Sequence, residues 1–167
     1  MQQLSRQTNS AAVLDRIVAE AIPNKSGLEA WQALMRAHAT LMRQLATDLV
    51  DEVGLTLGDF DVLVQLAQAG GDLRMSELAA QAYSSRSGMT RRIDRLADEG
   101  LVTRANTDAD GRGVLVGLTE AGLARLAEAA PVHLRRVSQL YVEKLTDQEL
   151  AALTSALTKV ALDCTFG

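Results

Sequence analysis

The stretch that decides the fold is SGMTRRIDRLADEGLVTR, residues 87–104. At 100° per residue its apolar side chains Met89, Ile93 and Leu96 fall within one narrow sector, and we expect them to face a core. Arg91 then points away from that core. The stretch therefore predicts an amphipathic helix with an arginine-bearing outer face.

Other helical and strand patterns surround this helix in a clear order. Before it, the sequence predicts helices over 11–22 and 28–53, a helix capped by Thr56 that runs to about Ala69, a very short strand over 73–75 and a short helix capped by Ser76. The central helix runs from about 86 to 99, and a β-hairpin of 101–104 and 114–118 follows it. The remaining elements are a helix from Thr119 to about Lys144 with a kink at Pro131, and a last helix from the capping box Thr146/Glu149 to about Asp163. Two short helices joined by a turn and followed by a hairpin define a winged helix-turn-helix, so we expect a mainly α fold with a small β-hairpin wing.

Composition restricts the functional classes. The chain has 167 residues, 47% of them hydrophobic, with a single cysteine and two histidines. One cysteine excludes an intrachain disulfide framework, and so few soft ligands make a metal site unexpected. No stretch approaches the roughly 18 consecutive apolar residues of a membrane span, and no secretory signal is visible. We therefore expect a cytoplasmic protein without a membrane or cofactor role.

Charge is uneven along the chain. The formal net charge is −4, which by itself argues against a nucleic-acid partner. Segment 84–112, however, has six arginines against five carboxylates, a net charge of +1, and leaves −5 for the remainder. Arg112 stands between two glycines at the expected tip of the hairpin, where an arginine fits the negative potential of a narrow minor groove. Asp94 on the central helix would repel phosphate, and we expect it to pair with an arginine.

In four segments the sequence resembles the MarR (multiple antibiotic resistance regulator) transcription factors. The residues that carry the resemblance are LTLGDFDVLVQLA (55–67), MSELAAQ (75–81), SGMTRRIDRLADEGLVTR (87–104) and DADGRGVLVGLTEAG (108–122). The resemblance implies a homodimer that binds a palindromic operator in double-stranded DNA, usually as a repressor. It also implies an N-terminal extension with one extra helix (1–26), a helical dimerisation region (27–53 and 119–167) and a winged helix-turn-helix DNA-binding lobe (54–118).

Site residues follow from the same resemblance. The recognition helix would be about 85–99 and the wing 104–118. The residues expected at the groove and the phosphates are Ser85, Arg86, Ser87, Thr90, Arg91 and Arg95. Arg112 would enter the minor groove with Asp110 as its support. Gly111 departs from the family, because many members have a second basic residue there.

The sequence indicates an effector site less clearly than it indicates the DNA-binding residues. Trp31, Met35 and His38 share one face of the long helix, which could line a pocket for a small aromatic acid or phenol, or could simply pack in a dimer core. The extra N-terminal helix together with Asp61, Arg92 and Arg104 resembles the urate-responsive branch of the family. That branch also has a tryptophan in the extra helix, whereas this chain has LDRIVAEA (14–21). Arg92 also suits a structural ion pair on the buried side of the central helix.

Three other functions are considered: redox sensing, enzymatic activity and protein–protein assembly. Redox sensing would need a reactive thiol, but Cys164 lies near the C-terminal end beside Asp163, an acidic neighbour that disfavours the thiolate. An enzyme is not expected, because no nucleophile–His–carboxylate set, phosphate loop or metal cluster is visible. A winged-helix module for protein–protein assembly without DNA binding is the alternative to a ligand-responsive repressor, and the acidic remainder of the chain favours it.

Overall fold

The computed structural model describes residues 2–22, 24–81, 86–106 and 113–164. The chain forms two compact units, Met1–Arg43 and Gln44–Gly167, which are described in turn. None of the helices in the described ranges is long and apolar enough to cross a membrane.

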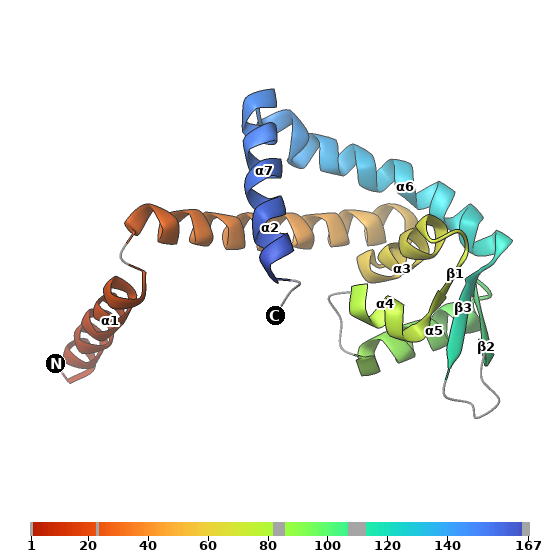
Figure 1. Ribbon diagram of the computed structural model, residues 1–167, viewed down its shortest axis with the longest axis horizontal. Helices are drawn as coiled ribbons and strands as arrows, with labels where there is room; N and C mark the ends of the chain where they lie inside the picture. The colour runs from red at the N-terminus through yellow and green to blue at the C-terminus, as the bar shows by residue number, and fades with distance from the viewer. Residues whose placement is uncertain (1, 23, 82–85, 107–112, 165–167) are drawn as a thin grey trace. The chain divides into compact units, whose positions relative to one another are not determined.

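The first unit is helical. It contains α1 (Gln2–Ala21) and the first part of α2 (Lys25–Val53) (Figure 1). Helix α2 starts three residues before the predicted start, because Asn24 accepts a hydrogen bond from the Ser26 backbone N–H (3.1 Å) and caps the helix. Helix α1 starts nine residues before its predicted start: the polar segment ahead of residue 11 has no apolar stripe, yet its residue types tolerate helix.

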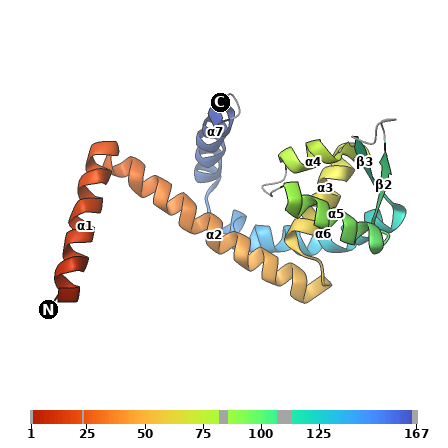
Figure 2. The ribbon, with the colours of Figure 1, turned by 90° about the horizontal axis from the view of Figure 1, so that it is seen from below.

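The second unit contains the rest of α2 and a winged helix-turn-helix. Its further elements are α3 (Leu57–Gln68), β1 (Asp72–Arg74), α4 (Met75–Gln81), α5 (Arg86–Asp98), β2 (Val102–Asn106), β3 (Val114–Leu118), α6 (Glu120–Leu140), the 3₁₀ turn η1 (Val142–Lys144) and α7 (Asp147–Cys164). Helices α3, α4 and α5 lie together beside the sheet (Figures 1 and 2). The mainly α fold with a small sheet is as predicted.

The sheet has three antiparallel strands in the order β1-β3-β2. The predicted hairpin is confirmed as β2 and β3, in which Arg104 pairs with Val116. The very short predicted strand is confirmed as β1, one residue earlier than expected, and it pairs with the other edge of β3 through Leu73 and Val116. Val116 is fully buried at the centre of this sheet.

The core of the lobe joins all its elements. The largest fully buried side chains are Leu49, Leu63, Leu66, Leu78, Met89, Ile93, Leu96, Val62 and Val116. Met89, Ile93 and Leu96 each have an exposed fraction of 0%, which confirms the predicted inner face of α5. Burial of these three side chains fixes which face of α5 remains outside.

Side-chain caps begin three helices of this unit, α3, α6 and α7, where the sequence predicts them. Thr56 accepts the Asp59 backbone N–H (3.2 Å), and Thr119 accepts that of Gly122 (3.0 Å). Thr146 and Glu149 form the predicted capping box, with the Thr146 backbone N–H donating to Glu149 Oε2 (2.8 Å).

Two further predicted boundaries, both in this unit, are wrong. Ser76 does not cap α4, because the helix begins at Met75 and the Glu77 carboxylate accepts the Arg74 backbone N–H (2.9 Å). Helix α6 continues through Pro131 as expected but ends at Leu140, and η1 occupies the last part of the predicted helix.

Candidate DNA-binding interface

The outer face of α5 is the candidate interface, and its position is set by burial on the opposite side. Its three core side chains fix the rotation of the helix about its axis. Arg91 is exposed and forms no ion pair with any carboxylate in the described ranges. An exposed arginine on a helix that is packed in this way can reach a phosphate or a base edge.

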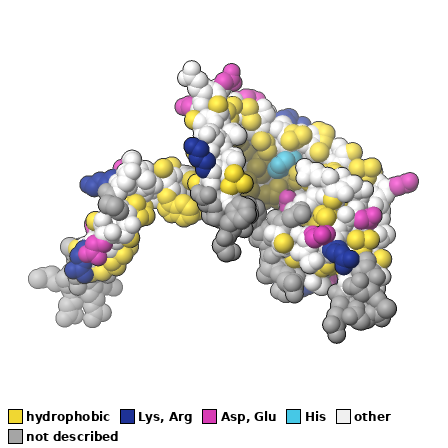
Figure 3. Space-filling view, viewed as in Figure 1, with side chains coloured by type: hydrophobic (Ala, Val, Ile, Leu, Met, Phe, Trp, Pro, Cys, Tyr) yellow, Lys and Arg dark blue, Asp and Glu magenta, His cyan; other side chains and the backbone are white. Residues whose placement is uncertain are grey.

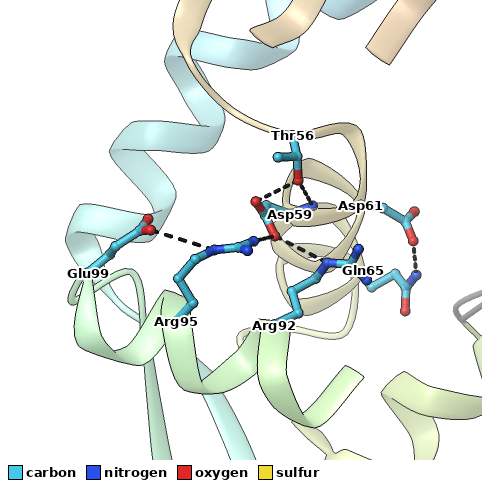
Figure 4. A network of polar contacts seen from close by, with 7 residues as sticks. All are labelled: Thr56, Asp59, Asp61, Gln65, Arg92, Arg95 and Glu99. Carbon is cyan, nitrogen blue, oxygen red and sulfur yellow. Dashed lines mark hydrogen bonds and ion pairs between the residues drawn. The ribbon is translucent and has the colours of Figure 1, made fainter. Parts of the chain in front are cut away.

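A buried carboxylate on α3 fastens α5 (Figure 4). Asp59 is 4% exposed, and its Oδ1 accepts from Arg92 Nε (3.2 Å) and also pairs with Arg95 Nη2. The hydroxyl of Thr56 donates to the other oxygen, Oδ2 (2.6 Å). A carboxylate removed from water needs such partners, and here two of them come from the recognition helix.

Gly58 makes room for this network. A Cβ at this position would lie 2.4 Å from Nη2 of Arg92. The glycine therefore allows the Arg92 guanidinium to lie flat against the first turn of α3.

Asp59 is the functional residue that sequence reasoning missed. The prediction that Arg92 suits a structural ion pair is confirmed, but the partner was not named. The signal was present: Thr56 followed three residues later by Asp59 has the spacing of a capping box, which places a carboxylate at the start of a helix. Periodicity does not show that this carboxylate is also buried against arginines of another helix.

Arg95, expected from the sequence at the groove and the phosphates, has two carboxylate partners in the structure. Its side chain is 50% exposed, yet it pairs with Asp59 and also with Glu99, at 3.7 Å from Nε to Oε1. Two carboxylates thus hold its guanidinium against the protein. Arg95 therefore fits a residue that positions α5 better than one that reads a base.

The structure does not bring Asp61, Arg92 and Arg104 together. Asp61 is exposed on α3 and accepts from Gln65 Nε2 (2.7 Å). Arg104 of β2 pairs with Asp94 of α5, so the expected partnership of Asp94 with an arginine is confirmed and ties the wing to the recognition helix. The three residues that resemble the urate-responsive branch thus have three different partners.

The other predicted site residues are placed as follows. Thr90 is half-buried on α5. The backbones of Arg86 and Ser87 belong to the first turn of α5, but their side chains, like Ser85, Asp110 and Arg112 as a whole, lie outside the described residues. Trp31, Met35 and His38 are all exposed on α2, with Trp31 at 56%. Within the described ranges, no group of three or more His, Cys, Asp or Glu side chains could hold a metal ion.

Comparison with known proteins identifies the family. A model described as the MarR family matches residues 53–113. An HTH-type transcriptional regulator of Bacillus cereus is 31% identical over 137 residues, which are 82% of this chain and 90% of that protein. The chain belongs to the MarR family.

Two solved structures from Streptomyces coelicolor are similar to this MarR-family chain. AbsC, a MarR family transcriptional regulator, is 31% identical with a TM-score of 0.77, covering 86% of this chain and 97% of AbsC. Sco3205, a MarR family transcriptional regulator in complex with DNA, is 29% identical with a TM-score of 0.75, covering 83% of this chain and 87% of Sco3205. This MarR-family chain is therefore a DNA-binding transcriptional regulator and not an enzyme.

Ion pairs connect the end of α2 in the regulator to α6. Arg136 Nε lies 2.6 Å from Asp48 Oδ2, and Arg135 Nη2 lies 2.5 Å from Glu52 Oε2. The hydrogen bond from Arg136 holds the pKa of Asp48 below its ordinary value. Ten residues before Arg135 on the same helix, Arg125 donates to the last carbonyl of α2, at Val53.

An imidazole lies between α6 and α3 of the MarR-family lobe. The ring of His133 is 4.7 Å from that of Phe60, centroid to centroid. Its Nδ1 is buried and has no hydrogen-bond partner among the described residues, and burial lowers the pKa of His133. Helix α6 thus contacts α3 through a pair of rings and contacts α2 through ion pairs.

Proposed function

We propose that this regulator is a homodimeric repressor that binds a palindromic operator and is released by a small aromatic acid or phenol. The observation that carries the proposal is the way in which α5 is held in the lobe. Its apolar face is fully buried, Asp59 of α3 holds two of its arginines, and Arg91 remains exposed. A recognition helix fixed in this way can enter a major groove in one orientation.

Exposed apolar side chains support the homodimer. In the second unit Leu134 is 63% exposed on α6, and Val160 and Leu162 on α7 are 58% and 57% exposed. Figure 3 shows hydrophobic side chains at the surface of α7. Large apolar side chains that gather on a surface mark an interaction site, and a second copy would cover the same patch by two-fold symmetry.

A two-fold dimer explains the expected operator. Its two recognition helices would lie roughly 34 Å apart, in successive major grooves, so the two half-sites would be inverted repeats. Occupation of such a site next to a promoter excludes polymerase, which supports the repressor reading that the family resemblance implies.

The effector proposal is supported by exposed side chains in the first unit. Trp31 and Met35 (39%) are exposed on α2 at a spacing of one turn, and His38 follows them. Aromatic, thioether and imidazole groups suit the ring and the acid group of a small aromatic acid. Binding there would release DNA only if it favours a different spacing of the two lobes.

The experiment is a fluorescence-anisotropy titration of the purified protein with a duplex from the intergenic region beside its own gene. We expect one dimer per duplex and a footprint with two inverted half-sites. Arg91→Ala and Arg112→Ala should weaken binding, while Lys144→Ala, which removes a charge from exposed η1, should not. Unchanged affinity in both arginine variants would contradict the proposal and favour the protein–protein module.

Dimerisation, repression and release each need a separate measurement. Sedimentation should give a dimer for the wild type and a monomer for Leu134→Glu; a monomeric wild type would contradict the dimer. Deletion of the gene should raise expression from the bound promoter; a fall would identify an activator. Thermal-shift screening against aromatic acids, phenols and purines, followed by operator competition, should find a compound that stabilises the protein and releases DNA.

A further inference from the structure

The winged lobe is acidic although it binds DNA. Residues 54–118 contain seven arginines and no lysine against nine carboxylates, a net charge of −2. Phosphate binding depends on cations that can displace the counterions of DNA. DNA binding by the lobe therefore depends on which of its arginines are not already paired with a carboxylate of the protein.

Ion pairs divide the described arginines of the lobe into two groups. Arg92 and Arg95 neutralise Asp59, and Arg104 neutralises Asp94. Arg74 and Arg91 are exposed, and neither forms an ion pair with any carboxylate in the described ranges. An arginine already held by a carboxylate of the protein contributes little to phosphate neutralisation, because its charge is compensated.

Arg74 occupies a defined place in the sheet. It is the last residue of β1 and pairs with Leu115 of β3, whereas Asp72 pairs with Gly117. Because β3 starts at Val114, Arg74 lies at the end of the sheet from which the wing segment 107–112 extends. The wing and α5 are the parts of a winged helix that approach DNA, and Arg74 adjoins both the wing end of the sheet and α4.

The side chain of Arg74 faces outward. Along β1 the neighbouring Leu73 packs against the core, and by alternation Arg74 projects from the opposite face. Only the backbone N–H of Arg74 is engaged by Glu77, which fixes the start of α4 and leaves the guanidinium exposed. Figure 3 shows Lys or Arg side chains on one face of the lobe with acidic side chains on both sides.

We propose that Arg74 is a further DNA-contacting residue, which binds a phosphate of the backbone beside the groove that α5 enters. Arg92 and Arg95 are positioning residues that act through Asp59. The inference rests on DNA binding by the winged lobe. Arg74 lies on a strand outside the recognition helix and would contact only the DNA backbone. It should therefore add affinity without a preference for DNA sequence.

The test is the salt dependence of DNA binding by the full-length protein. Operator affinity is measured between 50 and 200 mM salt for the wild type, Arg74→Ala, Arg74→Lys and Lys144→Ala. Each neutralised phosphate contributes about 0.9 to the slope of log affinity against log salt, so Arg74→Ala should lower the slope by about 1.8 in a two-fold dimer. The affinity difference between wild type and Arg74→Ala should then shrink about twelvefold over this salt range.

Controls separate a phosphate contact from a structural role. Arg74→Lys keeps the charge and should keep the wild-type slope, and Lys144→Ala should also keep it. Arg74→Ala should lose affinity for operator and for unrelated DNA by the same factor, with an unchanged unfolding temperature because the side chain is exposed. A wild-type slope in Arg74→Ala, or a loss confined to the operator, would overturn the inference. Absence of DNA binding by the wild type would instead refute the function on which it rests.

Discussion

Asp59→Asn tests whether the carboxylate of α3 holds the recognition helix. The substitution keeps the size of the side chain and one acceptor oxygen, and it removes the negative charge and replaces the other oxygen by an NH2 donor. Arg92 and Arg95 then lose their shared ionic partner, while the Thr56 cap can persist through its bond to the backbone N–H of residue 59.

The expected loss of stability follows from the exposed fractions of the paired side chains. A hydrogen bond to a charged group contributes about 1.5–3 kcal/mol, and breaking a fully buried ion pair costs about 3–5 kcal/mol. The Asp59 side chain is 6% exposed, but those of Arg92 and Arg95 are 27% and 50% exposed and regain water. We therefore expect a loss of about 2 kcal/mol, which for a chain of this size lowers the melting temperature by about 4–8 °C.

Urea unfolding followed by circular dichroism measures this loss, with Asp61→Asn as the matched control. Asp61 lies two residues further along α3, is exposed and accepts from Gln65 of the same helix, so its substitution should change stability by less than about 0.5 kcal/mol. Asp59→Asn should also weaken operator binding, because the helix that carries Arg91 is then held less firmly to α3. Equal unfolding midpoints for the two variants would refute the reasoning.

Three other variants test contacts elsewhere in the second unit. Gly122→Ala should destabilise the protein by about 2 kcal/mol or abolish folding, because its Cβ would lie 2.1 Å from the backbone oxygen of Leu101; wild-type stability would contradict that contact. The pKa of Asp48 is lowered by Arg136, so the pair stabilises the fold above the ordinary pKa of 3.8 and is lost as pH falls below it; Asp48→Asn should make acid unfolding less steep. Burial lowers the pKa of His133 from 6.5, so the unfolded chain binds the proton more readily and stability should fall as pH drops below 6.5; in His133→Leu this dependence should disappear from urea titrations at pH 7.5 to 5.

Elements with local signals were predictable from the sequence. Thr119 caps α6, and Thr146 with Glu149 caps α7, because a capping side chain binds backbone groups only a few residues away. The inner face of α5 was predictable for the same kind of reason, since a period of 3.6 residues specifies a face. Errors occurred where local signals are weak, at the polar start of α1 and at the end of α6 beyond Pro131.

The partners of the arginines were not predictable. Arg92 and Arg95 lie 33 and 36 residues from Asp59 along the chain, and Arg104 lies ten residues from Asp94. Arg95 was expected at the groove, and Arg92 was expected to suit an ion pair whose partner is not evident from the sequence. Which of them are compensated depends on distances between elements, and no periodic pattern contains those distances.

The sequence by itself determined the order of the elements, the buried face of the recognition helix and the family. The tertiary structure decided how the arginines are used: Asp59 takes two, Asp94 takes one, and Arg74 and Arg91 stay exposed without an ionic partner in the described ranges. The physical reason is that the periodicity of the sequence indicates which apolar side chains are buried. Compensation of an arginine's charge instead depends on which carboxylate the packed core brings within about 4 Å of its guanidinium.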